Sequence, residues 1–293
     1  MFRTPGAPSP APDETLSRLC RTWGMRYSRT GIVAVLLAAE VFIGGAILWA
    51  LGSGQWGWAA QPESVNRMSE QTEVDAGQAP HVVVDDPNNR VYVTASSDGK
   101  IHVTDHTHRF GWFIGPHSEA PLHVSRTGDG VSIVRGDGNV HAQVAFFGID
   151  FERTDVAVPA GSRLDIQHCE GATVEGVHAG DVKIACGDGS LHFADLQSPS
   201  IDAVTADGSI HASNLDVHGG RLQTGDGSIR VALAPANLLV HVQTGDGSIR
   251  FNGRRVAKDS DSGTADYQVG TGAGSLQVST QDGSIHIDTN GAN

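Results

Sequence analysis

Aspartate, serine and a basic residue recur together in the C-terminal half of the chain, each time around an Asp-Gly pair. The repeated fragments are GDGSLHF from residue 187, ADGSIHA from 206, GDGSIRV from 225, GDGSIRF from 245 and QDGSIHI from 281. In a strand, Ser190 and His192 would share one face, where the histidine could act as a base for the serine. A catalytic site needs one oriented nucleophile, base and oxyanion site, whereas this pair returns in several fragments. We therefore predict no catalytic residues here and no enzymatic activity.

The aspartates of these fragments are candidate cation ligands. If the fragments stack, they form a row of like charges at Asp188, Asp207, Asp226 and Asp246. Hydrogen bonds to the N–H groups of each turn would stabilise such a row, and a bridging calcium ion is the alternative. The calcium-binding nonapeptide repeat carries GGxGxD at about half this period, and the chain lacks that motif. We expect self-bonded turns and no cofactor.

The position two residues after each serine is histidine or arginine, at His192, His211, Arg230, Arg250 and His286. This position alternates with aliphatic residues, so it faces outward from a strand. A row of histidines can bind a transition metal or respond to acid. Because arginine interrupts the row and is not a metal ligand, we expect a solvated surface for interaction, formed by His192, His211, Arg230 and Arg250.

A second candidate is the segment DHTHRFGWFIGPHSEAP at residues 105–121, which combines histidines with aromatic residues. His106, His108, Trp112 and Phe113 could form an interaction patch or a ligand loop. Alternatively, the aromatic residues cover the open end of a repeat structure, which needs a cap to remain soluble. We expect residues 81–160 to be an N-terminal β region that forms this cap.

The repeat itself predicts the architecture. The octapeptide QTGDGSIR occupies residues 223–230 and 243–250, and most repeats are 19 or 20 residues apart. Aliphatic residues alternate with polar ones on both sides of each Asp-Gly pair, which indicates strand, corner and strand. Glycine at the corners accepts a positive φ, and the corner glycines are Gly189, Gly208, Gly227, Gly247 and Gly283. We predict an all-β chain with a single-stranded β-solenoid over residues 161–290, in which the two octapeptides lie in adjacent coils.

The apolar segment at residues 31–52 predicts one transmembrane helix, because it can cross a bilayer core of about 30 Å. Four arginines lie between residues 18 and 29, so residues 1–30 are expected to be a cytoplasmic tail and the body to lie outside. Glu40 requires a partner helix or a neutral carboxyl group. We expect an uncleaved signal anchor followed by a linker over residues 53–80, with cleavage as the alternative.

Composition limits the partners and the redox chemistry. The formal net charge is −13, which argues against a nucleic-acid partner. The cysteines, at positions 20, 169 and 186, form no zinc pattern. Cys169 and Cys186 could pair outside the cytoplasm, but aligning their repeats leaves them one position out of register. The sequence leaves this pairing open.

Three features together resemble a family of bacterial envelope proteins built from β-strand repeats, known as candidate adhesins or as a domain of unknown function. They are the GDGSI corners, VAVPAGSRLDI at 156–166 and YQVGTGAGSLQVSTQDGSIHIDT at 267–289. The resemblance covers roughly residues 80–290. It implies a β-solenoid, sometimes behind a single anchor, with no enzymatic residues to carry over. The insertion at 252–266 and the aromatic segment near residue 110 depart from it.

These observations predict a membrane-anchored, extracytoplasmic β-solenoid that acts as a non-enzymatic, adhesin-like or structural interaction module. Its expected partner is a component of the cell envelope or a surface glycan or protein. Two alternatives are an envelope sensor that signals through its membrane segment and a polysaccharide-active β-helix enzyme.

Overall fold

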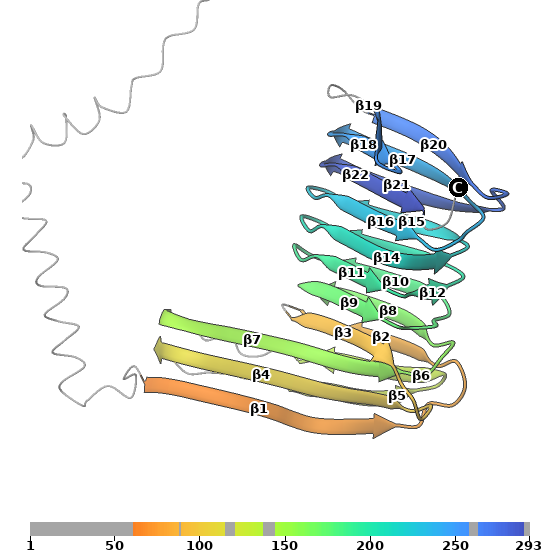
Figure 1. Cartoon of the computed structure of the whole chain (residues 1–293). Helices are drawn as coiled ribbons and strands as arrows, with labels where there is room; N and C mark the ends of the chain where they lie inside the picture. The colour runs from red at the N-terminus through yellow and green to blue at the C-terminus, as the bar shows by residue number, and fades with distance from the viewer. Residues whose placement is uncertain (1–60, 88, 115–120, 137–143, 258–262, 290–293) are drawn as a thin grey trace, which may run out of the picture. The chain divides into compact units, whose positions relative to one another are not determined.

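The regular elements of the computed structural model are all β-strands. The structure describes residues 61–87, 89–114, 121–136, 144–257 and 263–289, which belong to one compact unit (Figure 1). No helix within these described ranges is long and apolar enough to cross a membrane. The predicted tail at 1–30 and membrane segment at 31–52 lie outside them.

Seven coils form the body of the unit, and each contributes one strand to each of two sheets. In stacking order they are β2 His81–Asp85 with β3 Arg90–Ala95, β8 Arg163–Cys169 with β9 Gly171–Glu175, β10 Val182–Cys186 with β11 Leu191–Ala194, β13 Ile201–Thr205 with β14 Ile210–Val217, β15 Gly219–Thr224 with β16 Ile229–Leu233, β21 Gly274–Asp282 with β22 Ile285–Thr289, and β17 Leu238–Asp246 with β18 Ile249–Phe251. We call the sheet that contains β3 and β18 the first sheet and the other the second sheet. Strands of neighbouring coils pair in parallel, which is consistent with the predicted β-solenoid.

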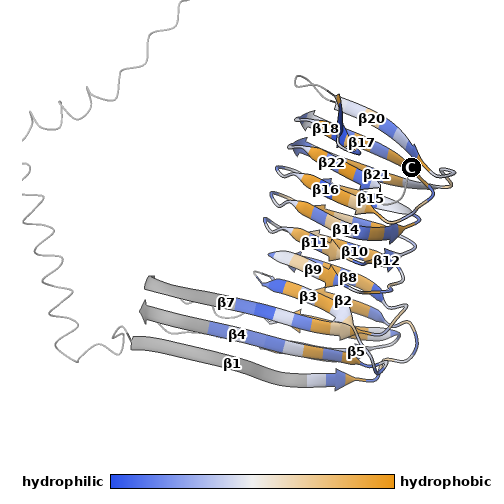
Figure 2. Ribbon diagram, in the orientation of Figure 1, coloured by the Kyte–Doolittle hydropathy of each residue, from blue (hydrophilic) through white to orange (hydrophobic). Residues whose placement is uncertain are grey.

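The core lies between the two sheets and is built from the aliphatic residues that alternate along each strand (Figure 2). Leu191, Ile210, Ile229, Ile285 and Ile249 form one such column in the first sheet and are fully buried. Burying an aliphatic side chain of this size contributes roughly 1.5–3 kcal/mol. Parallel sheets usually have both faces covered. Here only the inner face is apolar, so each sheet presents polar side chains on its outer face.

Antiparallel strands close both ends of the stack. At one end, β7 Val144–Val158 and β6 Gly130–Arg135 still pair in parallel with β3 and β2. Beyond them the antiparallel strands β4 Ile101–Ile114 and β1 Gln61–Val74 extend the first sheet, while β5 Leu122–Thr127 extends the second. At the other end, β19 Arg254–Ala257 and β20 Gly263–Val269 do the same. Residues 61–74 form β1, within the segment predicted as a linker, and residues 81–95 contain β2 and β3, within the predicted N-terminal β region.

The order of the last coils differs from the order of the sequence. β21 lies between β15 and β17, and β22 lies between β16 and β18. The two QTGDGSIR octapeptides are therefore separated by the coil that carries Gly283, and the prediction that they lie in adjacent coils is wrong. The reason is the inserted segment, which forms β19 and β20 along the edge strands and returns the chain into the stack.

A disulfide joins Cys169 and Cys186 on β8 and β10, with their Cα atoms 4.6 Å apart. The one-residue mismatch seen in the sequence is absorbed by an irregularity in β8. Gln167 pairs with Ala185 and Cys169 pairs with Cys186, which leaves His168 as an extra residue. His168 has a φ of 53°, the left-handed conformation that a bulge of this kind requires.

The Asp-Gly corners stack closely, and this explains their glycines. A methyl group on Gly208, Gly227 or Gly283 would overlap the carbonyl oxygen of the corner glycine in the coil next to it. Gly189, Gly208 and Gly227 do not have a positive φ, so close approach replaces the predicted reason for glycine at these positions. The predicted self-bonded turns do not form either. Within the described ranges, the exposed carboxylates of Asp188, Asp207, Asp226 and Asp246 accept no hydrogen bond and form no ion pair.

Buried threonines hold the corners together instead. The Oγ1 atoms of Thr205, Thr224 and Thr280 donate to the carbonyls of Gly189, Gly208 and Gly227 at 2.8, 2.6 and 2.9 Å. Thr244 donates to Gly283 at 3.0 Å. Cys186 is the Cα partner of Thr205 and therefore stands in line with these threonines. At this end of the line the disulfide takes the place of a threonine hydroxyl group.

Candidate functional site

The outer face of the first sheet carries a column of basic side chains on five consecutive strands, from β11 to β18. Its members are direct Cα partners in the order His192, His211, Arg230, His286 and Arg250. We call this column the cationic ladder. The sequence predicted that these side chains face outward in one row. The structure adds His286 between the two arginines, because the last coil is inserted there.

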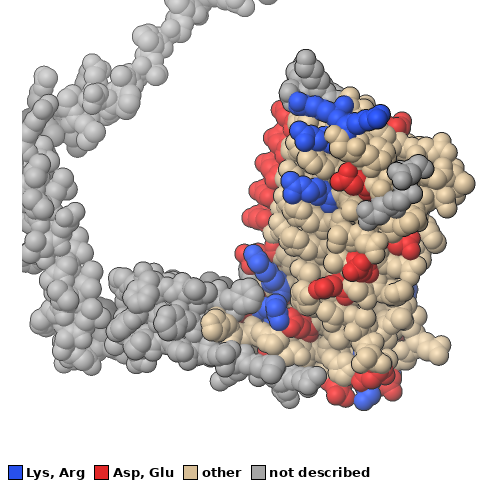
Figure 3. All heavy atoms as spheres, viewed as in Figure 1, with Lys and Arg blue, Asp and Glu red and all other residues tan. Residues whose placement is uncertain are grey.

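The members of the ladder are exposed or partly buried, and Asp288, two residues after His286 on β22, is an acid whose charge acts on the ladder. His192, Arg230 and Arg250 are exposed, and the other two are partly buried. Among the residues that the structure describes, Arg230 and Arg250 form no ion pair. The rings of His192 and His211 stack with their centroids 5.2 Å apart. Figure 3 shows Lys and Arg side chains gathered near one end of the stack, beside a row of Asp and Glu along its edge.

Two histidines of the ladder have lowered pKa values, chiefly because they are partly buried. Burial, followed by the nearby His192 and Arg230, lowers the pKa of His211 below its ordinary value. Burial, Arg250 and Arg230 lower the pKa of His286, and Asp288 offsets part of that effect. Both imidazoles are therefore neutral at pH 7, and the permanent charge of the ladder resides on the two arginines.

A column of serine hydroxyls runs beside the ladder. The carbonyls of Ser209, Ser228, Ser284 and Ser248 accept the N–H groups of the aliphatic residues in the neighbouring coils, so these serines are stacked as the corners are. Ser248 and Ser284 are also linked through their Oγ atoms at 3.2 Å. The face therefore combines fixed positive charge with neutral hydrogen-bonding groups.

The outer face of the second sheet carries a corresponding column with a different charge pattern. Its members are Asp165, Lys183, Asp202, Arg221, Gln277, His241 and Asp266. Acidic and basic residues alternate over the first four positions, and we call this column the alternating ladder. Arg221 lies 2.9 Å from Asp202 and His241 lies 2.7 Å from Asp266. This column is largely neutralised from within.

The predicted histidine and aromatic segment lies away from the cationic ladder. His106, His108, Trp112 and Phe113 all belong to β4, which is separated from β11 by β7, β3 and β9. The side chains of Trp112 and Phe113 lie outside the described part of the structure. The Nε2 atom of His106 is 3.0 Å from Asp155, which also pairs with Arg153 at 2.7 Å. Charges on this part of the face are thus paired.

A buried ionic cluster was not anticipated from the sequence. The Nε atom of Arg135 lies 2.6 Å from Asp86, and its Nη2 atom lies 2.8 Å from Asp105 and 3.1 Å from Thr154. Asp86 and Thr154 are completely buried. The cluster links β6 of the second sheet to β4 and β7 of the first, so its role is structural. The available signal was that all four residues continue the inward-facing positions of their segments.

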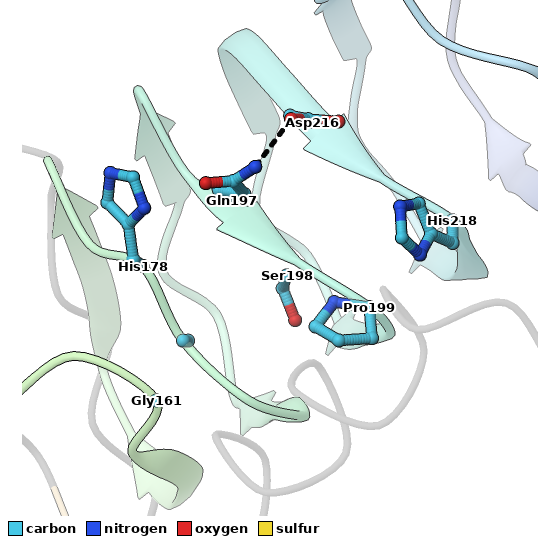
Figure 4. A pocket seen from close by; sticks show the side chains of 8 residues that line it. Gly161, His178, Gln197, Ser198, Pro199, Asp216 and His218 are labelled. Atoms are coloured by element: carbon cyan, nitrogen blue, oxygen red, sulfur yellow. Dashed lines mark hydrogen bonds between the residues drawn. The ribbon is translucent and has the colours of Figure 1, made fainter. Parts of the chain in front are cut away.

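A shallow pocket of about 280 Å³ lies on the third side of the coils, where the chain returns from the first sheet to the second (Figure 4). His178, Gln197 and Asp216 come from three successive coils, and the Nε2 atom of Gln197 donates to Asp216 at 3.0 Å. His218 and Pro199 line the same pocket. The described part of the chain contains no group of three His, Cys, Asp or Glu side chains that could hold a metal ion.

Comparison with known proteins gives one family and two structures. The family profile described as Toastrack DUF4097 matches residues 64–290. A candidate cell adhesion protein from Clostridium sporogenes is 10% identical, covers 78% of this chain and 100% of its own, and superposes with a TM-score of 0.40. A candidate adhesin from Bacteroides fragilis is 10% identical, covers 79% and 99%, and gives a TM-score of 0.24. No curated protein matches the sequence significantly.

Proposed function

Since the chain belongs to the Toastrack DUF4097 family, we propose that it acts through its repeated scaffold, as a non-enzymatic, adhesin-like module that binds another component of the cell envelope. The observation that carries this proposal is the cationic ladder. One chemical feature continues across five strands and several coils. Such a surface suits an extended partner, whereas a reaction centre would concentrate unlike groups at one point.

The proposed location is outside the cytoplasm, behind a membrane anchor at residues 31–52. The disulfide between Cys169 and Cys186 supports this location, because disulfides persist in oxidising compartments and are rare in the cytosol. The excess of arginine before residue 31 supports the same orientation. In this arrangement the described strands lie outside the cytoplasm.

The test uses the full-length protein produced in a bacterial host. Protease added to intact spheroplasts should cleave the body from the membrane, and the cleavage should require no lysis. Detergent-solubilised protein should then co-sediment with insoluble cell-wall material in a saturable way, without releasing new reducing ends from it. Protection of the body from protease, absence of co-sedimentation, or steady release of reducing ends would each contradict the proposal.

A further inference from the structure

The cationic ladder has a fixed spacing that the sheet imposes. Neighbouring strands of a sheet lie about 4.8 Å apart, so the Cα atoms of Arg230 and Arg250, which lie on either side of β22, are roughly 10 Å apart. His286 lies between them and can become positively charged. At neutral pH the ladder therefore presents two fixed positive charges, on Arg230 and Arg250, with the imidazole of His286 between them.

This arrangement is not required by the fold. Like charges directly opposite each other on neighbouring strands are destabilising, and the protein as a whole is strongly acidic. The second sheet avoids repulsion between like charges, because acidic and basic residues alternate in the order Asp165, Lys183, Asp202 and Arg221. A carboxylate between Arg230 and Arg250 would have been stabilising, yet His286 occupies that position. Within the described ranges Arg230 and Arg250 form no ion pair, so both guanidinium groups can bind an anion.

The surroundings of the ladder define the chemistry of the partner. The ladder runs in a straight column across the outer face of the first sheet, so it suits an extended chain. Ser209, Ser228 and Ser284 of the serine column are partly exposed and can form hydrogen bonds with hydroxyl groups, whereas Ser248 is buried. From β11 to β18, the outward positions that the structure describes hold no Trp, Tyr or Phe on which nucleic-acid bases could stack. The corner aspartates (Asp188, Asp207, Asp226 and Asp246) repel anions that lie beside the ladder. This repulsion favours a narrow anionic chain over a broad anionic surface.

Within the proposed function, on which this inference rests, we propose that the cationic ladder binds an extended acidic polymer of sugar or polyol units that carry one carboxylate or phosphate group each. The anionic groups pair with Arg230 and Arg250, and the hydroxyl groups of the polymer bond with the serine column. Binding is multivalent, since each exposed ion pair contributes at most about 1 kcal/mol.

The experiment measures binding of full-length protein, held in detergent, to four defined probes by calorimetry at low salt. They are oligogalacturonate for carboxylate, poly(glycerol phosphate) for phosphate, neutral dextran of matched length and single-stranded DNA. We expect one or both acidic polymers to bind, and the affinity to fall steeply as salt increases. Arg230→Gln with Arg250→Gln should weaken binding about tenfold or more. The matched control Arg221→Gln, on the alternating ladder, should change it less than twofold.

The outcomes separate this inference from the proposed function. Equal loss in the Arg230/Arg250 variant and the Arg221 control would overturn the inference, as would equal binding of dextran or tighter binding of DNA. If the double variant still co-sediments with cell-wall material like the wild type, the ladder is not the binding surface, although the interaction module stands. If neither the wild type nor the variants co-sediment, the proposed function fails. Urea unfolding of both variants confirms that they remain folded.

Discussion

The two outer faces of the stack differ in how they neutralise charge, although the same coils build both of them. On the second sheet, Asp202 lies between Lys183 and Arg221, and each base has an acid beside it. On the first sheet, His286 lies between Arg230 and Arg250, and neither arginine forms an ion pair within the described ranges. One face is complete within the protein, whereas the other leaves its charge for a partner.

A repeat protein can therefore acquire a function through its outward residues alone, without a change in its fold. The buried aliphatic residues, the corner glycines and the corner threonines serve both sheets at once. Only the outward positions distinguish the two faces. A change in the shared corner should therefore damage both faces together, whereas a change at an outward position should affect one face alone.

The largest effect is expected at the shared corner. In Gly227→Ala, the new methyl group would overlap the carbonyl oxygen of Gly208. Overpacking of this kind costs about 3 kcal/mol or more when the backbone itself must move. Urea unfolding should show the loss, and both faces should lose their order. Gly128→Ala is the matched control, because nothing lies within 4 Å of the added atom. Equal stability of the two variants would contradict the close stacking of the corners.

A smaller effect is expected when one face is converted into the other. Asp202→His replaces Lys183–Asp202–Arg221 by a Lys–His–Arg set with the spacing of Arg230–His286–Arg250. In a background that carries Arg230→Gln and Arg250→Gln, this change should restore acidic-polymer binding about tenfold, or about 1.4 kcal/mol. The lost ion pair with Arg221 should cost at most about 1 kcal/mol of stability.

The control for this transfer is Gln277→His in the same background, which adds a histidine to the same ladder without removing an acid. It lies beside Arg221 and His241 and should restore less binding than Asp202→His. If the two variants bind the acidic polymer equally well, unpaired cations do not explain why the two faces differ in binding.

Much of this architecture could be predicted from the sequence. The alternation around each Asp-Gly corner gave the strands, the buried column and the outward row of His192, His211, Arg230 and Arg250. Local patterns of this kind depend on neighbouring residues only. The order of the coils could not be predicted in the same way. Whether β17 or β21 pairs with β15 depends on residues 252–273, because the corner sequences TGDGSIR at 244–250 and TQDGSIH at 280–286 are too similar to favour either strand.

Two further features were hidden for similar reasons. The partner of a corner threonine is a carbonyl in another coil, and backbone groups leave no trace in the sequence. The donors do leave one signal, because Thr205, Thr224 and Thr244 each lie two residues before the aspartate of their corner. The pairing of Cys169 with Cys186 was obscured by the bulge at His168, because a single extra residue shifts the register by one place.

The smallest predicted effect concerns acid and again separates the faces. Folding lowers the pKa of His211 and of His286. The unfolded chain therefore binds protons more readily than the folded chain, and stability is lost as the pH falls below the ordinary histidine pKa of about 6.5. The loss continues until the pH passes below the lowered values. The groups that face these imidazoles are His192 and Arg230 for His211, and Arg230, Arg250 and Asp288 for His286.

The measurement is urea unfolding from about pH 7.5 to about pH 5.5, where histidine titrates. His211→Gln with His286→Gln should make the loss of stability with falling pH shallower than in the wild type. His241→Gln, which removes the histidine beside Asp266 on the alternating ladder, should not make it shallower. Saturating acidic polymer should oppose the loss, because its negative charge favours the protonated imidazoles of the cationic ladder. If the double variant keeps the full slope, these two histidines do not carry the acid response, and the electrostatic contrast between the faces is confined to their arginines.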